Sequence, residues 1–334
     1  MTLPPEPRPP VHVVVPEGID DPRRPSGGNV YDRRVVEELV ALGRTVHEHA
    51  VPGGWPHPDR AALAALARVL DAVPDGAVVL VDGLVASPSP VVLVPRSGRL
   101  RLVVLLHMPL GDARERAVVS AAHAVVTPSR WARRRVVQQH GVPAGAVHVA
   151  VPGIDPAPAA TGSRAGGRLL CVAAVVPDKG HDVLVEALGR LGRSRWRCRL
   201  VGATDLDPAY VAWLRTRVRA AGLGGRVLFT GPLTRHRLGM VASASDLVVT
   251  ASRRESYGMA VAEALARGLP VVATDVGGLP EAVGQAPDGS RPGLLVPPDD
   301  PGALADGLAR WLGDAGLRDR LRRAARRRGE DLGT

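Results

Sequence analysis

The sequence predicts an α/β protein built from two doubly wound, Rossmann-like domains with parallel sheets that face a central cleft. Short apolar runs of strand length alternate with helical patterns along the chain. Hydrophobic residues make up 45% of the sequence and aromatic residues only 3%, so Val, Leu and Ala must build the cores, which suits buried parallel strands covered by helices. The length of 334 residues suits about two domains.

The first half contains predicted strands separated by helical patterns. Strands are expected at residues 11–16, 44–51, 77–83, 101–107, 124–129 and 147–153. Helices fit between them, for example over residues 29–42 and over residues 59–72, where Asp59 is the expected N-cap. Residues 1–155 are therefore expected to form the N-terminal domain.

A segment rich in Pro, Ala and Gly, residues 152–167, is the expected linker. Beyond it, strands are expected at residues 168–175, 197–203, 226–231, 246–252, 270–274 and 293–296, with helices at 181–191, 208–221, 235–242, 258–267 and 301–312. This pattern predicts a C-terminal Rossmann-like domain over residues 156–312. A basic helix or tail is expected over residues 313–334.

The net charge of +10 favours an anionic partner: nucleic acid, an acidic membrane surface or a phosphorylated small molecule. The basic residues are not interleaved with aromatic ones and no nucleic-acid-binding motif occurs, so nucleic acid is the weaker interpretation. The basic stretch at residues 129–141, with Trp131 and Arg133 to Arg135, is a candidate for contact with an anionic membrane. A solvated basic helix is the alternative.

The composition also bears on the cellular compartment. Cys171 and Cys198 both lie in strand-like runs, which predicts neither a disulfide framework nor a zinc site. The first ten residues contain no apolar signal segment, and no apolar run approaches the roughly 18 residues of a membrane span. We expect a cytoplasmic protein, with peripheral contact at the inner face of the membrane left open.

Sheets of this kind bind ligands at the carboxyl ends of their strands. In residues 255–265, "ESYGMAVAEAL", a helix is expected to start near Gly258, where unpaired amides suit a phosphate or sugar oxygen. Glu255 lies in the preceding loop, and Glu263 lies among apolar residues of the helix. Glu263 could accept two hydrogen bonds from a vicinal diol such as a ribose, or it could pair with an arginine on a half-exposed helix.

The same geometry recurs at residues 175–184, where Lys179 and Gly180 open a helix after a strand. Lys179 is expected to point toward an anion near that helix N-terminus. A solvated turn lysine is the alternative. Because both stretches follow strands of one sheet, a diphosphate could lie between them.

Signals in the first half are weaker. Residues 25–34 form a Gly-rich turn that leads into a helix and could cradle a ligand through its amides. His107 ends a strand and could act as acid, base or hydrogen-bond donor, or be a satisfied core histidine. Asp82 closes another strand, and the loop at 53–58, which contains Trp55, could form part of an acceptor pocket or be a plain surface loop.

A D-x-D sequence at residues 205–207 has the form used to hold a metal on a nucleotide. Asp207 is more naturally the N-cap of the helix that follows. No metal site is predicted.

Taken together, these stretches resemble the retaining glycosyltransferases of family 4, which have the two-domain GT-B fold. Residues 255–283, "ESYGMAVAEALARGLPVVATDVGGLPEAV", look like that family's E-x7-E donor motif. Four other stretches resemble segments of the family. The P-x-K-G segment is similar to "PDKGHDVLVEAL", and the interdomain signature is similar to "VAVPGID". The Gly-Gly loop with the first helix is similar to "GGNVYDRRVVEELVALG", and the histidine segment is similar to "LLHMPLG". The resemblance covers about residues 11–312.

The resemblance implies a role for each site residue. Residues 156–312 would bind a nucleotide-sugar donor: Glu263 the ribose, Glu255 the sugar, and Lys179 the diphosphate, beside the backbone of Gly258 and Met259. From the acceptor-side domain, Gly27 and Gly28 would approach the phosphate, and His107 would face the transferred sugar and the acceptor. His107, Glu255 and Lys179 are thus the catalytic candidates. The sugar would pass with retention to a small-molecule, lipid or glycan acceptor, without metal or other cofactor.

Two features depart from the family's pattern. Five residues before the lysine the family usually has an arginine that also holds the diphosphate, and here that residue is Ala174. Arg253 or Arg254 is the candidate replacement. The family also commonly ends with a helix that crosses back onto the first domain, and the basic helix before Thr334 leads us to expect a short or absent crossover.

Two further functions stay open on sequence grounds. One is a GT-B-fold sugar-nucleotide epimerase or phosphorylase, which sugar transfer to an added acceptor would argue against. The other is a non-catalytic protein that binds a nucleotide sugar or a membrane, which nucleotide binding without any donor turnover would favour.

Overall fold

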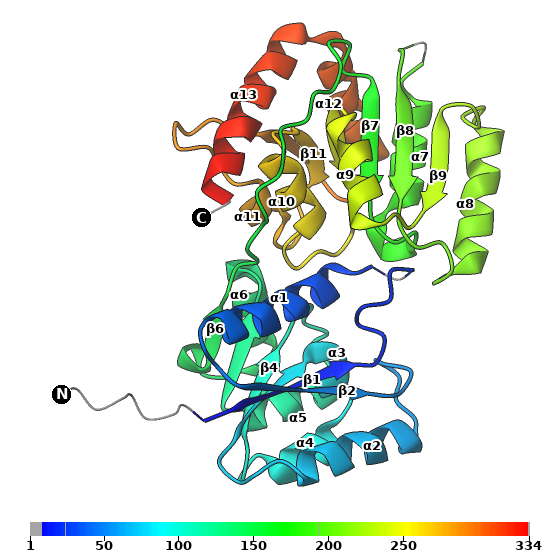
Figure 1. Ribbon diagram of the computed structural model, residues 1–334. Helices are drawn as coiled ribbons and strands as arrows, with labels where there is room; N and C mark the ends of the chain where they lie inside the picture. The colour runs from blue at the N-terminus through cyan, green and yellow to red at the C-terminus, as the bar shows by residue number, and fades with distance from the viewer. Residues whose placement is uncertain (1–8, 24, 193, 333–334) are drawn as a thin grey trace. The chain divides into compact units, whose positions relative to one another are not determined.

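A computed structural model describes residues 9–23, 25–192 and 194–332. The chain separates into two compact units, each described here by itself (Figure 1). The first comprises the residues up to Asp20 together with Gly28–Val151, and the second comprises Asp21–Gly27 and the residues from Pro152 onward.

The first unit holds a parallel sheet with the strand order β2-β1-β3-β4-β5-β6. Its strands are β1 (Val11–Pro16), β2 (Val46–Val51), β3 (Val78–Asp82), β4 (Arg101–Leu105), β5 (Ala124–Thr127) and β6 (Val147–Val149). The chain reverses direction across the sheet between β1 and β3, which creates the switch point where α/β sheets bind ligands.

Helices cover both faces of this sheet. They are α1 (Gly27–Ala41), α2 (Arg60–Asp71), α3 (Gly83–Ala86), α4 (Pro90–Leu93), α5 (Ala113–Ala121) and α6 (Arg130–His140), with short 3₁₀ turns at Val94–Arg96 and Ala144–Ala146. Buried aliphatic residues of α2 to α6 form one core with the strands, including Leu66, Val118 and Val136. On the other face, α1 packs Val36 and Leu39 against the smaller cluster around Val13.

The second unit repeats this architecture with the order β12-β11-β10-β7-β8-β9, again with parallel pairing throughout. Its strands are β7 (Arg168–Val172), β8 (Arg197–Val201), β9 (Val227–Gly231), β10 (Leu247–Thr250), β11 (Val271–Thr274) and β12 (Gly293–Val296). Its switch point lies between β7 and β10.

Two helical layers enclose this second sheet. The helices are α7 (His181–Gly189), α8 (Pro208–Ala220), α9 (Arg235–Ser243), α10 (Met259–Ala266), α11 (Leu279–Val283), α12 (Pro301–Gly313) and α13 (Ala315–Leu332), with a 3₁₀ turn at Pro177–Lys179. One buried cluster joins a sheet face to α7, α8 and α12, and another joins the opposite face to α9, α10 and α11. The basic helix α13, red in Figure 1, contributes Leu321 to the first cluster and Ala325 to the second.

The predicted strands all form, and the differences lie at their ends. Several predicted strands run on past the observed carboxyl end: the strand expected at 101–107 ends at Leu105, and that expected at 168–175 ends at Val172. The prediction that Gly27 and Gly28 lie in a turn is wrong, because they are already the first residues of α1. The expected linker segment lacks helix or strand up to β7, and Ser163 within it bonds the buried Asp246 of the second unit.

The part of the chain that the structure describes contains no helix with the length and apolarity needed to span a membrane.

Candidate functional site

The strongest pair of site residues lies at the switch point of the second unit. Lys179 ends the 3₁₀ turn after β7, and Glu255 lies in the loop after β10, the strand that pairs with β7. Lys179 Nζ donates a hydrogen bond to Glu255 Oε2 over 2.7 Å, and the two side chains are 26% and 19% exposed. A cation and a carboxylate are thus held together, within reach of solvent, where a sheet of this topology binds its ligand.

Glycines set the backbone of this pair. Gly180 has a φ of 61°, and a Cβ there would collide with the Ala251 carbonyl oxygen, so glycine brings the turn that carries Lys179 against the loop after β10. On the other side of Glu255, Gly278 N donates to its carbonyl oxygen over 2.9 Å. A Cβ at Gly277, whose φ is 61°, would overlap that same oxygen. Side chains at these positions would displace the loop that presents Glu255.

Helix α10 starts beside this loop. Its N-cap, Gly258, has a φ of 106° and no side chain to cap the first amides, which leaves the start of the helix, at Met259, suited to an anion. Glu263 lies one turn further along and is half-buried. Burial raises the pKa of its carboxyl, and the charges of Arg235 and Arg267 offset this only in part.

No hydrogen bond or ion pair to the Glu263 carboxylate is present within residues 9–23, 25–192 and 194–332. The alternative in which Glu263 pairs with an arginine is therefore not what the structure shows. A half-buried carboxylate without a protein partner is available to accept hydrogen bonds from a ligand.

The two arginines considered as replacements for the charge missing at Ala174 differ in their contacts. Arg253 donates to both oxygens of Asp182 and to Asp299, which fixes its guanidinium within the protein. Arg254 is 48% exposed, and its ion pair among the described residues is a loose one of 3.7 Å with Asp178. Arg254 is thus the arginine of the two that a ligand could recruit.

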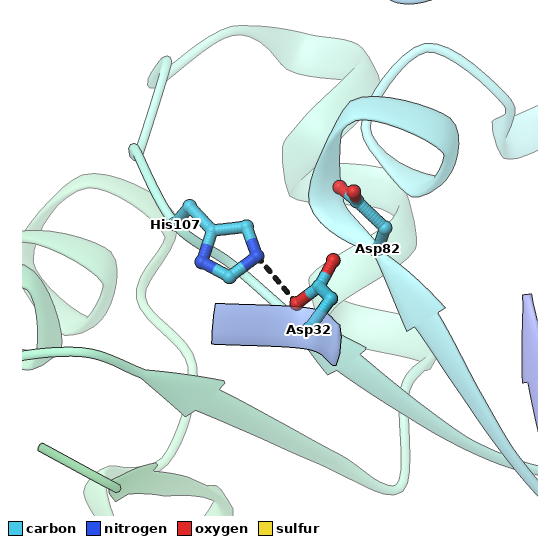
Figure 2. Close-up of side chains that lie close together, drawn as sticks. All are labelled: Asp32, Asp82 and His107. Atoms are coloured by element: carbon cyan, nitrogen blue, oxygen red, sulfur yellow. Dashed lines mark hydrogen bonds and ion pairs between the residues drawn. The ribbon is translucent and has the colours of Figure 1, made fainter. Parts of the chain in front are cut away.

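In the first unit, Figure 2 shows three side chains that converge at the carboxyl edge of the sheet: His107 after β4, Asp82 at the end of β3, and Asp32 on α1. His107 Nε2 hydrogen-bonds Asp32 Oδ1 over 2.7 Å. Burial of the imidazole disfavours its protonation, but the hydrogen bond and the charges of Asp32 and Asp82 outweigh this, so the pKa of His107 is raised. Gly28 allows this packing, because a Cβ there would lie 3.2 Å from the imidazole.

Asp82 is buried, whereas a side chain that contacts the acceptor would be exposed to solvent. Its side chain is 1% exposed, and its Oδ1 accepts a hydrogen bond from Leu84 N at the start of α3. Burial, followed by the charge of Asp32, raises the pKa of Asp82 to about 7. With His107 and Asp32 it forms a set of three possible ligand atoms within 4.8 Å of one another, the grouping that could hold a metal among the described residues.

A further buried carboxylate supports the segment that follows His107. Glu115 of α5 is 0% exposed and accepts from Leu110 N and Gly111 N at 3.0 Å each, from Ser87 Oγ at 3.1 Å and from His140 Nε2 at 2.7 Å. One side chain thus ties the loop after β4 to α3 and α6.

Two other predicted residues are used by the fold. Trp55 packs against the first unit's core, and its indole N–H donates to Val51 O over 3.2 Å. Asp207 caps α8 by accepting from Tyr210 N over 2.9 Å, which confirms the interpretation as an N-cap. Asp32 and Glu115 were not singled out by the sequence, because each lies in a helix among other charged residues and nothing in the local pattern marks it as buried.

The architecture matches that of solved structures. The structure aligns with the sucrose-phosphate synthase of Thermosynechococcus elongatus with a TM-score of 0.79 and 23% identity, over 98% of this chain and 95% of that one. It also aligns with Anabaena HepE, solved in complex with UDP and glucose, with a TM-score of 0.70 and 20% identity over 98% and 97% of the two chains. The chain has the GT-B fold, as predicted.

The sequence also matches a known family. Residues 165–328 match the model of the family described as glycosyl transferases group 1. Relatives named D-inositol 3-phosphate glycosyltransferase include one from Jonesia denitrificans, 37% identical over 56% of this chain and 48% of its own length. Another, from Xylanimonas cellulosilytica, is 35% identical over 64% of this chain and 54% of its own length. The chain therefore spans about half the length of the curated relatives that it matches.

Proposed function

We propose that this protein is a retaining glycosyltransferase that moves a sugar from a nucleotide-sugar donor to an acceptor hydroxyl. The observation that carries the proposal is the Lys179–Glu255 pair at the switch point of the second unit. Beside it, the Glu263 carboxylate on the neighbouring helix has no partner in the described part of the chain. Relatives named glycosyltransferases, and a structural neighbour solved with UDP-glucose, support it over an epimerase, a phosphorylase or a non-catalytic binder.

In this proposal the second unit binds the donor. Lys179 and the first amides of α10, at Gly258 and Met259, hold the diphosphate, Glu255 accepts hydrogen bonds from the sugar, and Glu263 accepts them from the ribose. Arg254 supplies the charge that Ala174 does not. Charge grows on the leaving phosphate as the glycosidic bond breaks, and a fixed cation with preorganised amides stabilises it.

The first unit serves the acceptor. Gly27 and Gly28 allow close approach of the phosphate at the start of α1, and His107 contacts the transferred sugar and the acceptor. The acceptor oxygen forms its bond on the face that the phosphate leaves, and the acceptor proton passes to the leaving phosphate oxygen. No metal or other cofactor takes part. The acceptor is a polyol or another small molecule, a lipid or a glycan, in keeping with the names of the relatives.

Replacing Glu263 with alanine is expected to weaken binding of the cognate nucleoside diphosphate by about 10- to 100-fold, the loss of roughly 1.5–3 kcal/mol from hydrogen bonds to a charged group. The measurement is a thermal-shift screen of nucleoside diphosphates and nucleotide sugars, followed by calorimetric titration. Glu330→Ala, an exposed charge on α13, is the matched control and is expected to bind as the wild type does. If no nucleotide stabilises the wild type, the proposed function fails; if the Glu263 variant responds equally, only the ribose role fails.

We also propose that the exposed basic face of α6 makes peripheral contact with an anionic membrane. Arg134 and Arg135 are exposed, whereas Arg133 donates to the backbone oxygens of Val147 and Ala144 and thus serves the fold. We expect co-sedimentation with vesicles that contain anionic lipid to exceed that with neutral vesicles, and to fall in Arg134→Ala/Arg135→Ala. Equal binding to both kinds of vesicle would remove the membrane from the proposal.

A further inference from the structure

A buried acid pair lies behind the His107 imidazole in the first unit. Asp32 and Asp82 are 0% and 1% exposed, whereas the His107 side chain is 19% exposed. Figure 2 shows that the three side chains come from different elements, α1, the end of β3 and the segment after β4, and converge on one point. The fold therefore brings these acids together, although 50 residues of sequence separate them.

Each acid has one satisfied oxygen and one orphaned oxygen. Asp32 Oδ1 bonds His107 Nε2, and Asp82 Oδ1 accepts from Leu84 N over 2.6 Å. The Oδ2 atoms of both residues are buried and lack a hydrogen-bond partner in the part of the chain that is described. Two neighbouring buried carboxylates cannot both stay ionised without a cation between them, because desolvation and mutual repulsion both disfavour the second charge.

A single proton between the two acids would serve both orphaned oxygens. One oxygen from each acid and a nitrogen of His107 lie within 4.8 Å of one another, and burial and the charge of Asp32 raise the pKa of Asp82. The pair then holds one proton and one negative charge, which a protonated His107 neutralises. A metal ion on the same three residues would instead have to break the 2.7 Å bond between His107 and Asp32.

We propose that Asp82 holds a proton that it shares with Asp32, and that the charge remaining on Asp32 keeps His107 doubly protonated, with Nδ1–H available as a donor. Asp32 and Asp82 are then positioning residues, and His107 is the residue that contacts substrate. The role of His107 rests on the proposed function, whereas the protonation of the acid pair does not. The titratable groups that face His107 are Asp32 from α1 and Asp82 from β3, and Tyr31 of α1 packs edge-on against its ring with centroids 5.2 Å apart.

The direct test uses the ligand-free, full-length wild type. The ¹³C carboxyl resonance of Asp82, identified by its loss in Asp82→Asn, is expected to show a protonated acid at pH 5 and to titrate near neutrality. The His107 imidazole, identified through His107→Gln, is expected to stay protonated above the usual range for histidine. Asp32→Asn should lower the pKa of His107 by about one unit or more, because it removes the adjacent charge. Asp82→Asn should not, because its amide also donates to Asp32.

A stability measurement gives an independent readout. The unfolded chain ionises Asp82 above its ordinary pKa of 3.8, while the folded protein keeps the proton until about pH 7. The folded state thus binds more protons across this window, and the free energy of unfolding falls as the pH rises through it. Asp82→Asn has no carboxyl that titrates here, so it does not lose stability in this way. Its unfolding midpoint in urea, relative to that of the wild type, should therefore rise as the pH is raised from 4 to 7.

Three results would overturn the proposal: an ionised Asp82 at pH 5, an equal fall in the pKa of His107 in Asp82→Asn and Asp32→Asn, or a stoichiometric divalent metal in the purified wild type that Asp82→Asn loses. The resonance and stability arms need no substrate. They therefore report on the acid pair even if the protein transfers no sugar, and nucleotide binding can persist if the acid pair fails.

Discussion

Replacing Lys179 with alanine is expected to lower the turnover of sugar transfer by about 10²- to 10³-fold, the usual cost of removing one preorganised group that stabilises charge in the transition state. Lys179 is the one lysine in a sequence of 43 basic residues, the other 42 being arginine. Its compact ammonium lies 2.7 Å from Glu255, so its removal also leaves that carboxylate unpaired beside the leaving phosphate.

The measurement is turnover at saturating donor and acceptor, with the free energy of unfolding as a check on folding. Arg190→Ala, at the end of α7 with its side chain 50% exposed, is the matched control and should keep full turnover. Lys179→Arg keeps the charge but replaces the compact ammonium with a planar guanidinium. Its turnover should therefore lie between that of Lys179→Ala and that of Arg190→Ala. Turnover within threefold of the wild type in Lys179→Ala would show that another group holds the diphosphate.

Replacing Glu115 with alanine is expected to lower the stability of the first unit by about 3–5 kcal/mol, the range seen when one partner of a buried charged network is removed. The change strands the donors at Leu110, Gly111, Ser87 and His140, all of which now converge on one carboxylate. The loop after β4, which begins at His107, loses its anchor at the same time.

Chemical denaturation followed by a probe in the first unit measures this effect. Glu115→Gln should lose less, because its amide oxygen still accepts some of these hydrogen bonds. Glu330→Ala should change stability by no more than about 0.5 kcal/mol, as expected for an exposed side chain away from such a network. A loss below about 1 kcal/mol in Glu115→Ala would mean that water or a rearranged loop satisfies the stranded donors.

The alternation of strands and helices was predictable because buried parallel strands leave continuous apolar runs. The ends of the strands were harder to predict, and the segment at His107 shows why. Leu106 stays buried after β4 has ended, so the apolar pattern continues into the loop that carries the site. The prediction for Gly27 and Gly28 failed differently: glycine favours turns, but here both residues lie in the first turn of α1, where Gly28 packs closely against the His107 imidazole.

The site was predictable where its residues follow strands of the sheet. Lys179 and Glu255 could be placed at neighbouring strand ends, and the structure joins them directly. Asp32 and Glu115 could not be found this way, because their surroundings come from residues distant in the sequence. Asp32 lies beside Asp82 and His107, and Glu115 bonds His140. Glu263 was a candidate on sequence grounds, but only the three-dimensional arrangement reveals that its carboxylate has no partner among the described residues.

The single lysine allows a direct test of the proposal that a nucleotide binds at the switch point between β7 and β10. An amine-specific acylating reagent can modify Lys179, which is 26% exposed, and peptide mass spectrometry can follow the rate with the α-amino group as internal reference. We expect the nucleoside diphosphate found by thermal shift to slow acylation of Lys179 in proportion to the fraction bound and to leave the α-amino rate unchanged. Unchanged acylation of Lys179 at saturating nucleotide would contradict the proposal.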